Sequence, residues 1–210
     1  MIDRRCALLA GAGAAAGLAL PLTSGPTLAE SSAVKLTDDG LHAQPWFEQT
    51  FLDLNEDAAD AHAQGKSLVI FFEQRGCPYC AEMHKVNLAK PEISDYIKTN
   101  FFALQLNLYG SRKVRDFDGT ELEERKLAQR WKVNFTPTLV FFPPDPAALS
   151  GKAGADGEAW RLVGYWKPFH FLGTFVYVKE RGYESEPNFQ HWLNAYREQL
   201  RAEGKDVSLW

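Results

Sequence analysis

The stretch "SLVIFFEQRGCPYCAEMHK" (residues 67–85) joins a continuous apolar run to two cysteines that are separated by two residues. Residues 67–73 are rich in β-branched and aromatic side chains, which predicts a buried strand. A helix is expected to begin at Pro78, because proline is favoured in the first helical turn. The spacing therefore predicts Cys77 and Cys80 at a strand-to-helix junction, and the fold prediction starts from this junction.

Three kinds of chemistry fit this cysteine spacing: a redox couple, part of a metal site, or a structural disulfide. A structural zinc site normally has four ligands, and the chain has no second cysteine pair; His84 is expected on the helix surface rather than as a third ligand. A structural disulfide would close a very small loop and stabilise little beyond local geometry. Redox chemistry is favoured, because a helix N-terminus stabilises a thiolate at Cys77. Cys77 would then attack a disulfide and Cys80 would resolve the mixed disulfide.

The first residues have the pattern of an export signal. A short basic segment, "MIDRR", precedes an apolar stretch rich in Gly and Ala, and Thr27 and Ala29 occupy the small-residue positions before a cleavage site. Residues 1–29 are therefore predicted to be a cleaved signal peptide. Arg4 and Arg5 also resemble a twin-arginine signal, and the Sec and twin-arginine routes both stay open. The expected location is the periplasm.

The charge argues against a nucleic-acid partner. The chain has 23 basic and 27 acidic residues, and removal of 1–29 leaves 21 and 26, a net charge of −5. An acidic protein is poorly suited to nucleic acid or to an anionic membrane surface. No apolar run beyond the signal is long enough to span a bilayer, so no direct membrane span is expected after cleavage.

The rest of the chain alternates strands with helices, which predicts an α/β sheet. Residues 30–44 are expected to form a flexible leader. Further strands are expected at 101–108, 138–142 and 159–165, and helices at 45–66, 78–90, 91–100, 121–133, 167–183 and 188–204. In the first helix, Phe47, Phe51 and Leu54 are expected to face inward. The last two strands are separated by a Pro- and Gly-rich loop, so we expect an antiparallel pair within a mixed four-stranded sheet that has helices on both faces.

A second motif, "WKVNFTPTLVFF" (131–142), places Pro137 at the start of a buried strand. Together with the Cys-x-x-Cys junction, this motif resembles the thioredoxin superfamily over about residues 45–180. The resemblance implies a thioredoxin-like domain at 45–210, with extra helices at both ends, and a thiol:disulfide oxidoreductase activity. It implies no cofactor beyond the redox-active cysteine pair.

The resemblance also implies a substrate-binding wall opposite the cysteines. Pro137 would be cis, and the Thr136 backbone would pair with the bound substrate segment. Pro78 and Tyr79 lie inside the cysteine motif, and Gly164 in "VGY" corresponds to a glycine whose backbone comes close to the active site.

Several further segments, among them "LQLNLYG" and "DFDGTEL", look like the periplasmic thioredoxins of bacterial sulfur-oxidation (Sox) clusters, the SoxW group. This resemblance implies a carrier that receives electrons from a membrane donor of the CcdA type. The carrier would pass them to periplasmic protein disulfides or thiol adducts, including those of Sox proteins. Two alternatives are a disulfide reductase in cytochrome c maturation and a non-catalytic partner- or metal-binding module.

The sequence departs from the superfamily pattern at the buried acid. Many thioredoxins have an aspartate six residues before the first cysteine, where this chain has Phe71. The nearest acid is Glu73, for which proton transfer and an exposed place at the strand end are equally open. The Pro-Tyr dipeptide between the cysteines is typical of glutaredoxins and suggests a less reducing couple, while the direction of electron flow stays open.

Overall fold

A computed structural model of the chain describes residues 35–205 and residue 207. The predicted signal peptide at 1–29 lies outside the described residues, as does the beginning of the predicted leader. Among the described residues, no helix combines the length and apolar character that a membrane crossing requires.

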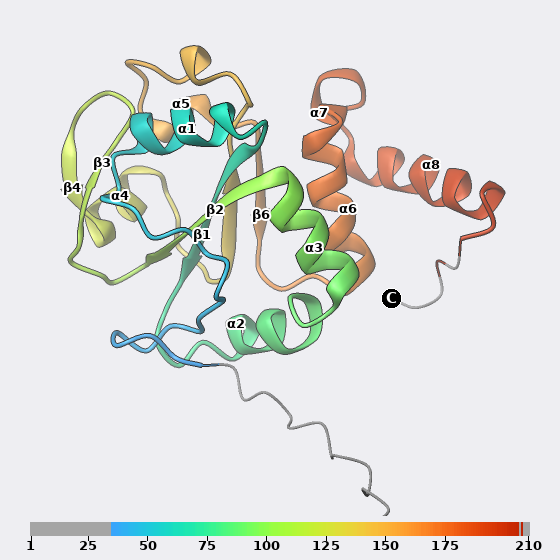
Figure 1. Cartoon of the computed structure of the whole chain (residues 1–210), viewed down its shortest axis with the longest axis horizontal. Coiled ribbons are helices and arrows are strands. Elements are labelled where there is room, and N and C mark those ends of the chain that lie inside the picture. Colours follow the sequence, from blue (N-terminus) through green and yellow to red (C-terminus); the bar gives the residue numbers. More distant parts are fainter. Residues whose placement is uncertain (1–34, 206, 208–210) are drawn as a thin grey trace, which may run out of the picture. The chain divides into compact units, whose positions relative to one another are not determined.

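A mixed four-stranded sheet forms the centre of the described chain (Figure 1). Its strands, in spatial order, are β2 (Phe101–Asn107), β1 (Ser67–Glu73), β5 (Thr138–Phe141) and β6 (Trp160–Val163). β1 pairs in parallel with β2 and antiparallel with β5, and β6 pairs antiparallel with β5. The predicted mixed sheet and its antiparallel last pair are confirmed.

Helices cover both faces of this sheet, and the chain also forms a small hairpin of β3 (Lys113–Arg115) and β4 (Glu121–Glu123). The α-helices are α1 (Leu54–Ala63), α2 (Pro78–Glu82), α3 (Pro91–Asn100), α4 (Glu124–Arg130), α5 (Gly154–Gly157), α6 (Pro168–Lys179), α7 (Gly182–Ser185) and α8 (Phe189–Ala202). A π-helical segment (Met83–Asn87) continues α2, and a 3₁₀ turn (Pro146–Ala148) interrupts the loop after β5.

The side chains of β1 are divided between two hydrophobic cores, because successive side chains of a strand point to opposite faces. Leu68, Ile70 and Phe72 pack with residues of α1 and α4 on one face. Val69 and Phe71 pack on the other face with residues of α3, α6 and α8 and of the π-helical segment. Every residue of β1 is buried, which confirms the strand predicted from its continuous apolar run.

The first helix differs from its prediction. It begins at Leu54 rather than at residue 45, because the Asp53 side chain accepts hydrogen bonds from the N–H groups of Asn55 and Glu56 and so caps it. Residues 45–47 form a turn instead of a helix, and Phe51 is 99% exposed, so the predicted inward placement of Phe51 was wrong. Its spacing matched the helical period by coincidence.

Residues 35–44 contact the open edge of the sheet. Leu36 and His42 form an isolated antiparallel bridge, and the Thr37 N–H donates to the Leu41 carbonyl at 2.8 Å. The Gln105 side chain on β2 donates to the His42 carbonyl at 2.8 Å. From Lys35 onward, the segment predicted as a leader therefore has defined contacts beside the cysteine loop.

Candidate active site

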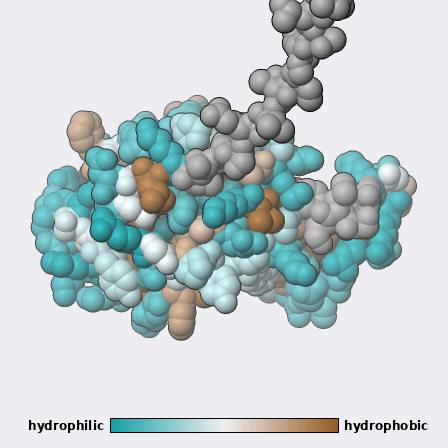
Figure 2. All heavy atoms as spheres, turned by 90° about the horizontal axis from the view of Figure 1, so that it is seen from below, coloured by the Kyte–Doolittle hydropathy of each residue, from teal (hydrophilic) through white to brown (hydrophobic). Residues whose placement is uncertain are grey.

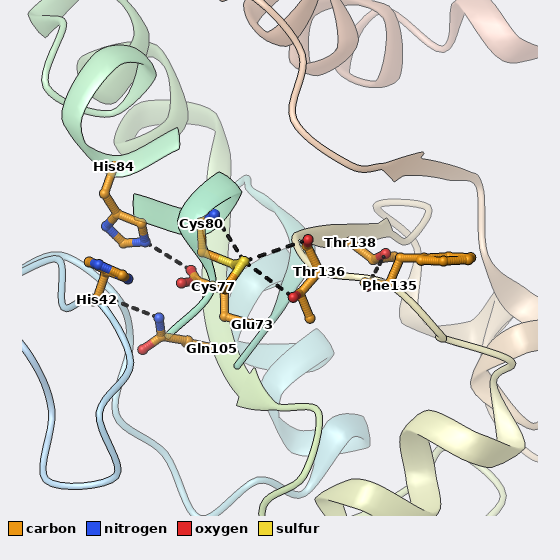
Figure 3. The surroundings of a disulfide bond; sticks show 9 residues. All are labelled: His42, Glu73, Cys77, Cys80, His84, Gln105, Phe135, Thr136 and Thr138. Carbon is orange, nitrogen blue, oxygen red and sulfur yellow. Dashed lines mark hydrogen bonds and ion pairs between the residues drawn. A yellow bond between two sulfur atoms is a disulfide. The ribbon is translucent and has the colours of Figure 1, made fainter. Parts of the chain in front are cut away.

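The cysteine pair lies where β1 passes into α2. Cys77 is the N-cap of α2 and forms a disulfide with Cys80, one helical turn further on (Figure 3). The Cys80 N–H donates to Cys77 Sγ at 3.0 Å, and Pro78 occupies the first turn. Because free N–H groups at a helix start favour negative charge, this position stabilises a Cys77 thiolate once the disulfide is reduced.

The two cysteines differ in access to solvent. Cys77 keeps 3% of its surface exposed, whereas Cys80 has none. The partner of a thiol exchange must reach a sulfur directly, because the reaction proceeds through a mixed disulfide. Cys77 is therefore the outer sulfur of the pair, which a partner can reach, and Cys80 is the inner one.

The segment predicted to face the cysteines does so. The Thr136–Pro137 peptide bond is cis. The Thr136 hydroxyl donates to Cys77 Sγ at 3.3 Å, and the Thr136 carbonyl oxygen lies 3.6 Å from the same sulfur (Figure 3). The Gly164 N–H donates to the Pro137 carbonyl at 2.8 Å, which fixes the neighbouring loop against this wall.

An accessible apolar rim borders the buried disulfide. Tyr79, next to Cys80, is 62% exposed, and Phe135, next to Thr136, is 68% exposed. Pro78 and Val163 are also exposed. Figure 2 shows hydrophobic residues as separate patches on a largely hydrophilic surface. The exposed apolar side chains next to the motif offer contact area to a polypeptide that approaches Cys77.

Glu73, the last residue of β1, is fully buried, so it is not an exposed strand-end residue. Its Oε1 lies 2.8 Å from Nε2 of His84, whose side chain is also fully buried (Figure 3). Oε2 of Glu73 has no hydrogen-bond partner among the described residues. The candidate site thus contains a buried carboxylate with one oxygen paired and one free.

The expectation that His84 lies on the helix surface was wrong. Its exposed fraction is 1%, because it shares the inward face of its helix with Cys80, Met83 and Asn87. These positions follow Cys80 at steps of three, four and seven, the spacing of one helix face. That spacing, counted from the buried cysteine, is the signal that could have identified His84.

Two side chains from the segment before α1 complete the surroundings of His84. Gln44 Nε2 lies 3.0 Å from His84 Nδ1, and the ring of His42 lies 5.3 Å from the His84 ring, centre to centre. Burial lowers the pKa of His42, and the nearby His84 and Lys85 lower it further, whereas Glu73 raises it. His42 is therefore neutral at pH 7.

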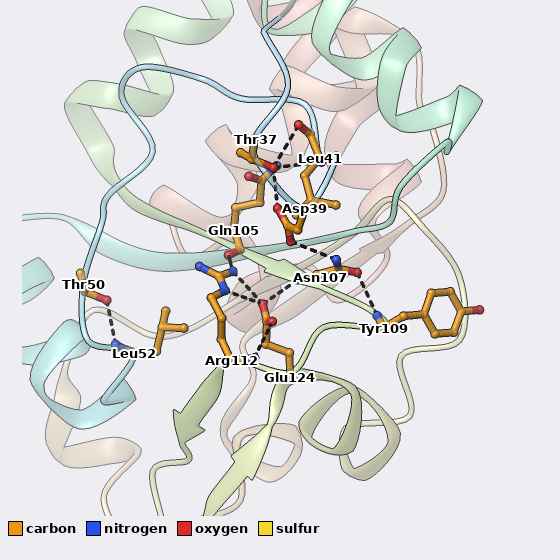
Figure 4. A network of polar contacts seen from close by, with 10 residues as sticks. All are labelled: Thr37, Asp39, Leu41, Thr50, Leu52, Gln105, Asn107, Tyr109, Arg112 and Glu124. Atoms are coloured by element: carbon orange, nitrogen blue, oxygen red, sulfur yellow. Dashed lines mark hydrogen bonds and ion pairs between the residues drawn. The ribbon is translucent and has the colours of Figure 1, made fainter.

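Arg75 does not approach Cys77 through any described contact. Its Nε donates to the Asp39 carbonyl at 3.1 Å, and the side chain lines a cleft of about 650 Å³ beside β2. In this cleft the Glu124 carboxylate accepts hydrogen bonds from the Arg112 side chain and from the Asn107 N–H (Figure 4). The cysteines do not line the cleft, so it is separate from the candidate active site.

Within the described residues, no group of three or more His, Cys, Asp or Glu side chains is arranged to hold a metal ion. The cysteine pair itself is engaged in the disulfide.

Comparison with known proteins supplies the family. Residues 54–179 match the family model described as a thioredoxin-like domain, which covers more than half of the chain. The chain belongs to this family. A search of curated proteins found no match.

Solved structures with a similar fold include a thioredoxin from Thermus thermophilus, at 27% sequence identity and a TM-score of 0.46, covering 60% of this chain and 83% of that one. A thioredoxin-fold protein from Helicobacter pylori is 24% identical, with a TM-score of 0.47 and coverage of 72% and 97%. The C-terminal domain of Neisseria meningitidis DsbD in its oxidised form is 18% identical, with a TM-score of 0.39 and coverage of 58% and 88%.

The thioredoxin-like fold and the disulfide-forming Cys-x-x-Cys pair make the chain a thiol–disulfide oxidoreductase. One departure from the superfamily pattern noted in the sequence has a structural counterpart. Phe71 lies in the aromatic core with Phe47 and Phe175, and the buried acid on this strand is Glu73 instead.

Proposed function

We propose that this thioredoxin-like protein reduces protein disulfides or thiol adducts in the periplasm as a soluble electron carrier. The observation that carries the proposal is the arrangement around Cys77. It is the outer cysteine of the pair, lies at a helix N-terminus and faces the segment that contains the cis Thr136–Pro137 peptide bond. Exposed apolar residues beside the cysteine motif offer a contact surface for a protein substrate.

In the proposed reaction, the reduced protein attacks through the Cys77 thiolate. A bond forms between Cys77 Sγ and one substrate sulfur, and the other substrate sulfur leaves as a thiolate. Cys80 then attacks Cys77 Sγ, which releases the reduced substrate and forms the Cys77–Cys80 disulfide. Thr136 and Pro137 would hold the substrate segment, with Pro78, Tyr79 and Gly164 bordering it, and Glu73 would accept the Cys80 proton.

The periplasmic setting is supported by the signal-peptide pattern at 1–29. The resemblance to the SoxW group supports Sox proteins as substrates and a CcdA-type membrane protein as the electron donor. The same chemistry would serve a reductase of cytochrome c maturation, from which the identity of the trapped substrate distinguishes it.

Trapping tests this function. A Cys80→Ser variant, expressed with the complete chain in its native host, should accumulate a mixed disulfide through Cys77, because the resolving thiol is missing. Mass spectrometry of the non-reduced complex identifies the substrate. The Cys77→Ser variant is the matched control and should trap little, because Cys80 is fully buried.

The outcomes separate the alternatives. Sox proteins in the complex support the sulfur-oxidation assignment, and components of cytochrome c maturation replace it with the second role. If the Cys80→Ser variant traps nothing that the Cys77→Ser variant does not, the carrier function is overturned.

A further inference from the structure

We propose that His84 is a positioning residue, which holds the Glu73 carboxylate so that its free oxygen, Oε2, receives the proton of Cys80. The inference rests on the proposed function and adds two residues to it, His84 and Gln44. The Glu73 carboxylate is fully buried, and only one of its two oxygens has a partner among the described residues.

The chain topology brings the three groups together. Glu73 ends β1, four residues before Cys77, and His84 follows Cys80 by one turn on the same buried helix face. Figure 3 shows the Glu73 carboxylate between the His84 ring and the cysteine pair. Because Cys80 has no exposed surface, bulk water cannot take its proton directly, and the buried Glu73 carboxylate, drawn beside the pair in Figure 3, is the group suited to do so.

Gln44 defines which nitrogen of His84 carries hydrogen. Its Nε2 is an amide NH₂, which only donates, so His84 Nδ1 must accept at the observed 3.0 Å. The neutral ring then carries its hydrogen on Nε2 and donates it to Glu73 Oε1 at 2.8 Å. Oε1 is occupied by this bond, and Oε2 is the oxygen that can gain a proton.

In the described part of the chain, no neighbouring charged group competes for the hydrogen bond between His84 and Glu73. His42 faces it from the segment before α1, and burial lowers the pKa of His42, so it stays neutral at pH 7. Lys85 follows His84 on the helix and is exposed, and Gln105 on β2 contacts the His42 carbonyl instead of Glu73. Phe47 packs edge-on against the His84 ring at 6.0 Å, centre to centre. Among the described residues, no Lys or Arg side chain forms an ion pair with Glu73.

In the proposed step, Glu73 takes up a proton and the two cysteines are oxidised. In the mixed disulfide, the Cys80 thiol gives its proton to Glu73 Oε2. The Cys80 thiolate forms a bond to Cys77 Sγ, and the bond between Cys77 Sγ and the substrate sulfur breaks. The substrate sulfur leaves with the electron pair as a thiolate and is reduced, while the two cysteines are oxidised to the disulfide. The proton on Glu73 is released to solvent after the reduced substrate has left.

Reaction of the reduced protein with dithiobis-nitrobenzoate separates the two chemical steps. Attack by Cys77 releases the first coloured thiolate, and resolution by Cys80 releases the second. We expect Glu73→Gln to slow the second release roughly a hundredfold at neutral pH and to leave the first unchanged. The second release should then rise with pH, because hydroxide replaces the missing carboxylate as the base.

Two substitutions at His84 test the positioning role. His84→Leu removes the donor to Glu73 Oε1, and we expect the second release to slow about tenfold with a shifted pH profile. His84→Gln retains an N–H donor and should restore most of the rate and the original pH profile. Glu82→Gln, an exposed acid on the same helix, is the matched control and should change neither step.

Each result decides the proposal. If His84→Gln is as slow as His84→Leu, the histidine handles the proton itself and the positioning role is overturned; equal rates in all variants overturn it as well. A first release that fails in the unsubstituted protein would instead overturn the proposed function. Circular dichroism identifies a variant that does not fold, and if His84→Leu is lost in this way, the comparison of His84→Gln with Glu73→Gln decides.

Discussion

Two carboxylates of this protein are equally buried and very differently paired. Neither Asp116 nor Glu73 has exposed surface. Asp116 Oδ1 accepts from the N–H groups of Phe117 and Gly154, and Oδ2 accepts from Arg130 and from the Trp131 indole. Glu73 has one partner, His84, and a free oxygen.

This difference separates a structural role from a chemical one. A buried charge whose lone pairs are all used is compensated and has no free position for a proton. Asp116 ties the β3–β4 hairpin to the end of α4 and to the start of α5, so it serves the fold. A buried carboxylate with an unused oxygen is under-compensated, which is tolerated where the group exchanges protons. The comparison predicts that substitutions will affect stability at Asp116 and the thiol chemistry at Glu73.

The largest effect is expected for Asp116→Asn. The new amide NH₂ would face donors on one side, so either the N–H groups of Phe117 and Gly154 or Arg130 and the Trp131 indole would lose the oxygen that accepts from them. We expect a loss of about 3–5 kcal/mol in the free energy of unfolding, measured by urea denaturation. Asp118→Asn is the control, since Asp118 pairs with the same Arg130 at a partly exposed position and should cost about 1 kcal/mol or less. A small effect at Asp116 would contradict its structural role.

Asp57 in α1 lies between these two cases and provides a second way to test the comparison. It is buried, its Oδ2 has no partner among the described residues, and burial raises its pKa from 3.8 to about 6, although Thr50 lowers it. A raised folded-state pKa means that the contribution of Asp57 to stability is greatest below about pH 4. That contribution is lost as the pH rises through 6.

Asp57→Asn should therefore stabilise the protein above pH 6. Raising a pKa from 3.8 to about 6 corresponds to about 3 kcal/mol, and because the substituted amide also loses favourable contacts we expect a gain of about 2 kcal/mol at pH 8. The gain should nearly vanish at pH 4, where the wild-type carboxyl is largely protonated in the folded state. Urea denaturation at both pH values measures this, with the exposed Asp60→Asn on the same helix as control. An equal gain at both values would show that protonation of Asp57 is not its cause.

The sequence predicted the regular part of this architecture because local patterns determine it. The apolar run 67–73 forms β1, and Pro91 starts α3, at the boundaries expected. The β3–β4 hairpin was missed because its strands have three residues each and are mostly charged. The helix expected from residue 45 was too long because Phe47 and Phe51 happened to continue the spacing of the helix that begins at Leu54.

The candidate site was predictable only in part. Cys77, Cys80 and Pro137 stand in recognisable motifs, whereas the partners of Glu73 do not. His84 lies 11 residues from Glu73 and Gln44 lies 40 residues from His84, so the fold alone brings them together. The free oxygen of Glu73 is a property of the packed interior, and no local pattern in the sequence indicates it.

The smallest effect on stability is expected for Glu73→Gln, which makes it the sharpest test of the comparison. The glutamine oxygen can still accept from His84, and a neutral amide replaces an under-compensated charge, so the gain and the loss nearly cancel. We expect the free energy of unfolding to change by about 1 kcal/mol or less in urea, while the resolution step slows as proposed above. Asp116→Asn should do the opposite, with a large loss of stability and an unchanged rate in the folded fraction. If Glu73→Gln instead destabilised the fold as strongly as Asp116→Asn, the unused oxygen would have no chemical meaning, because both carboxylates would then be structural.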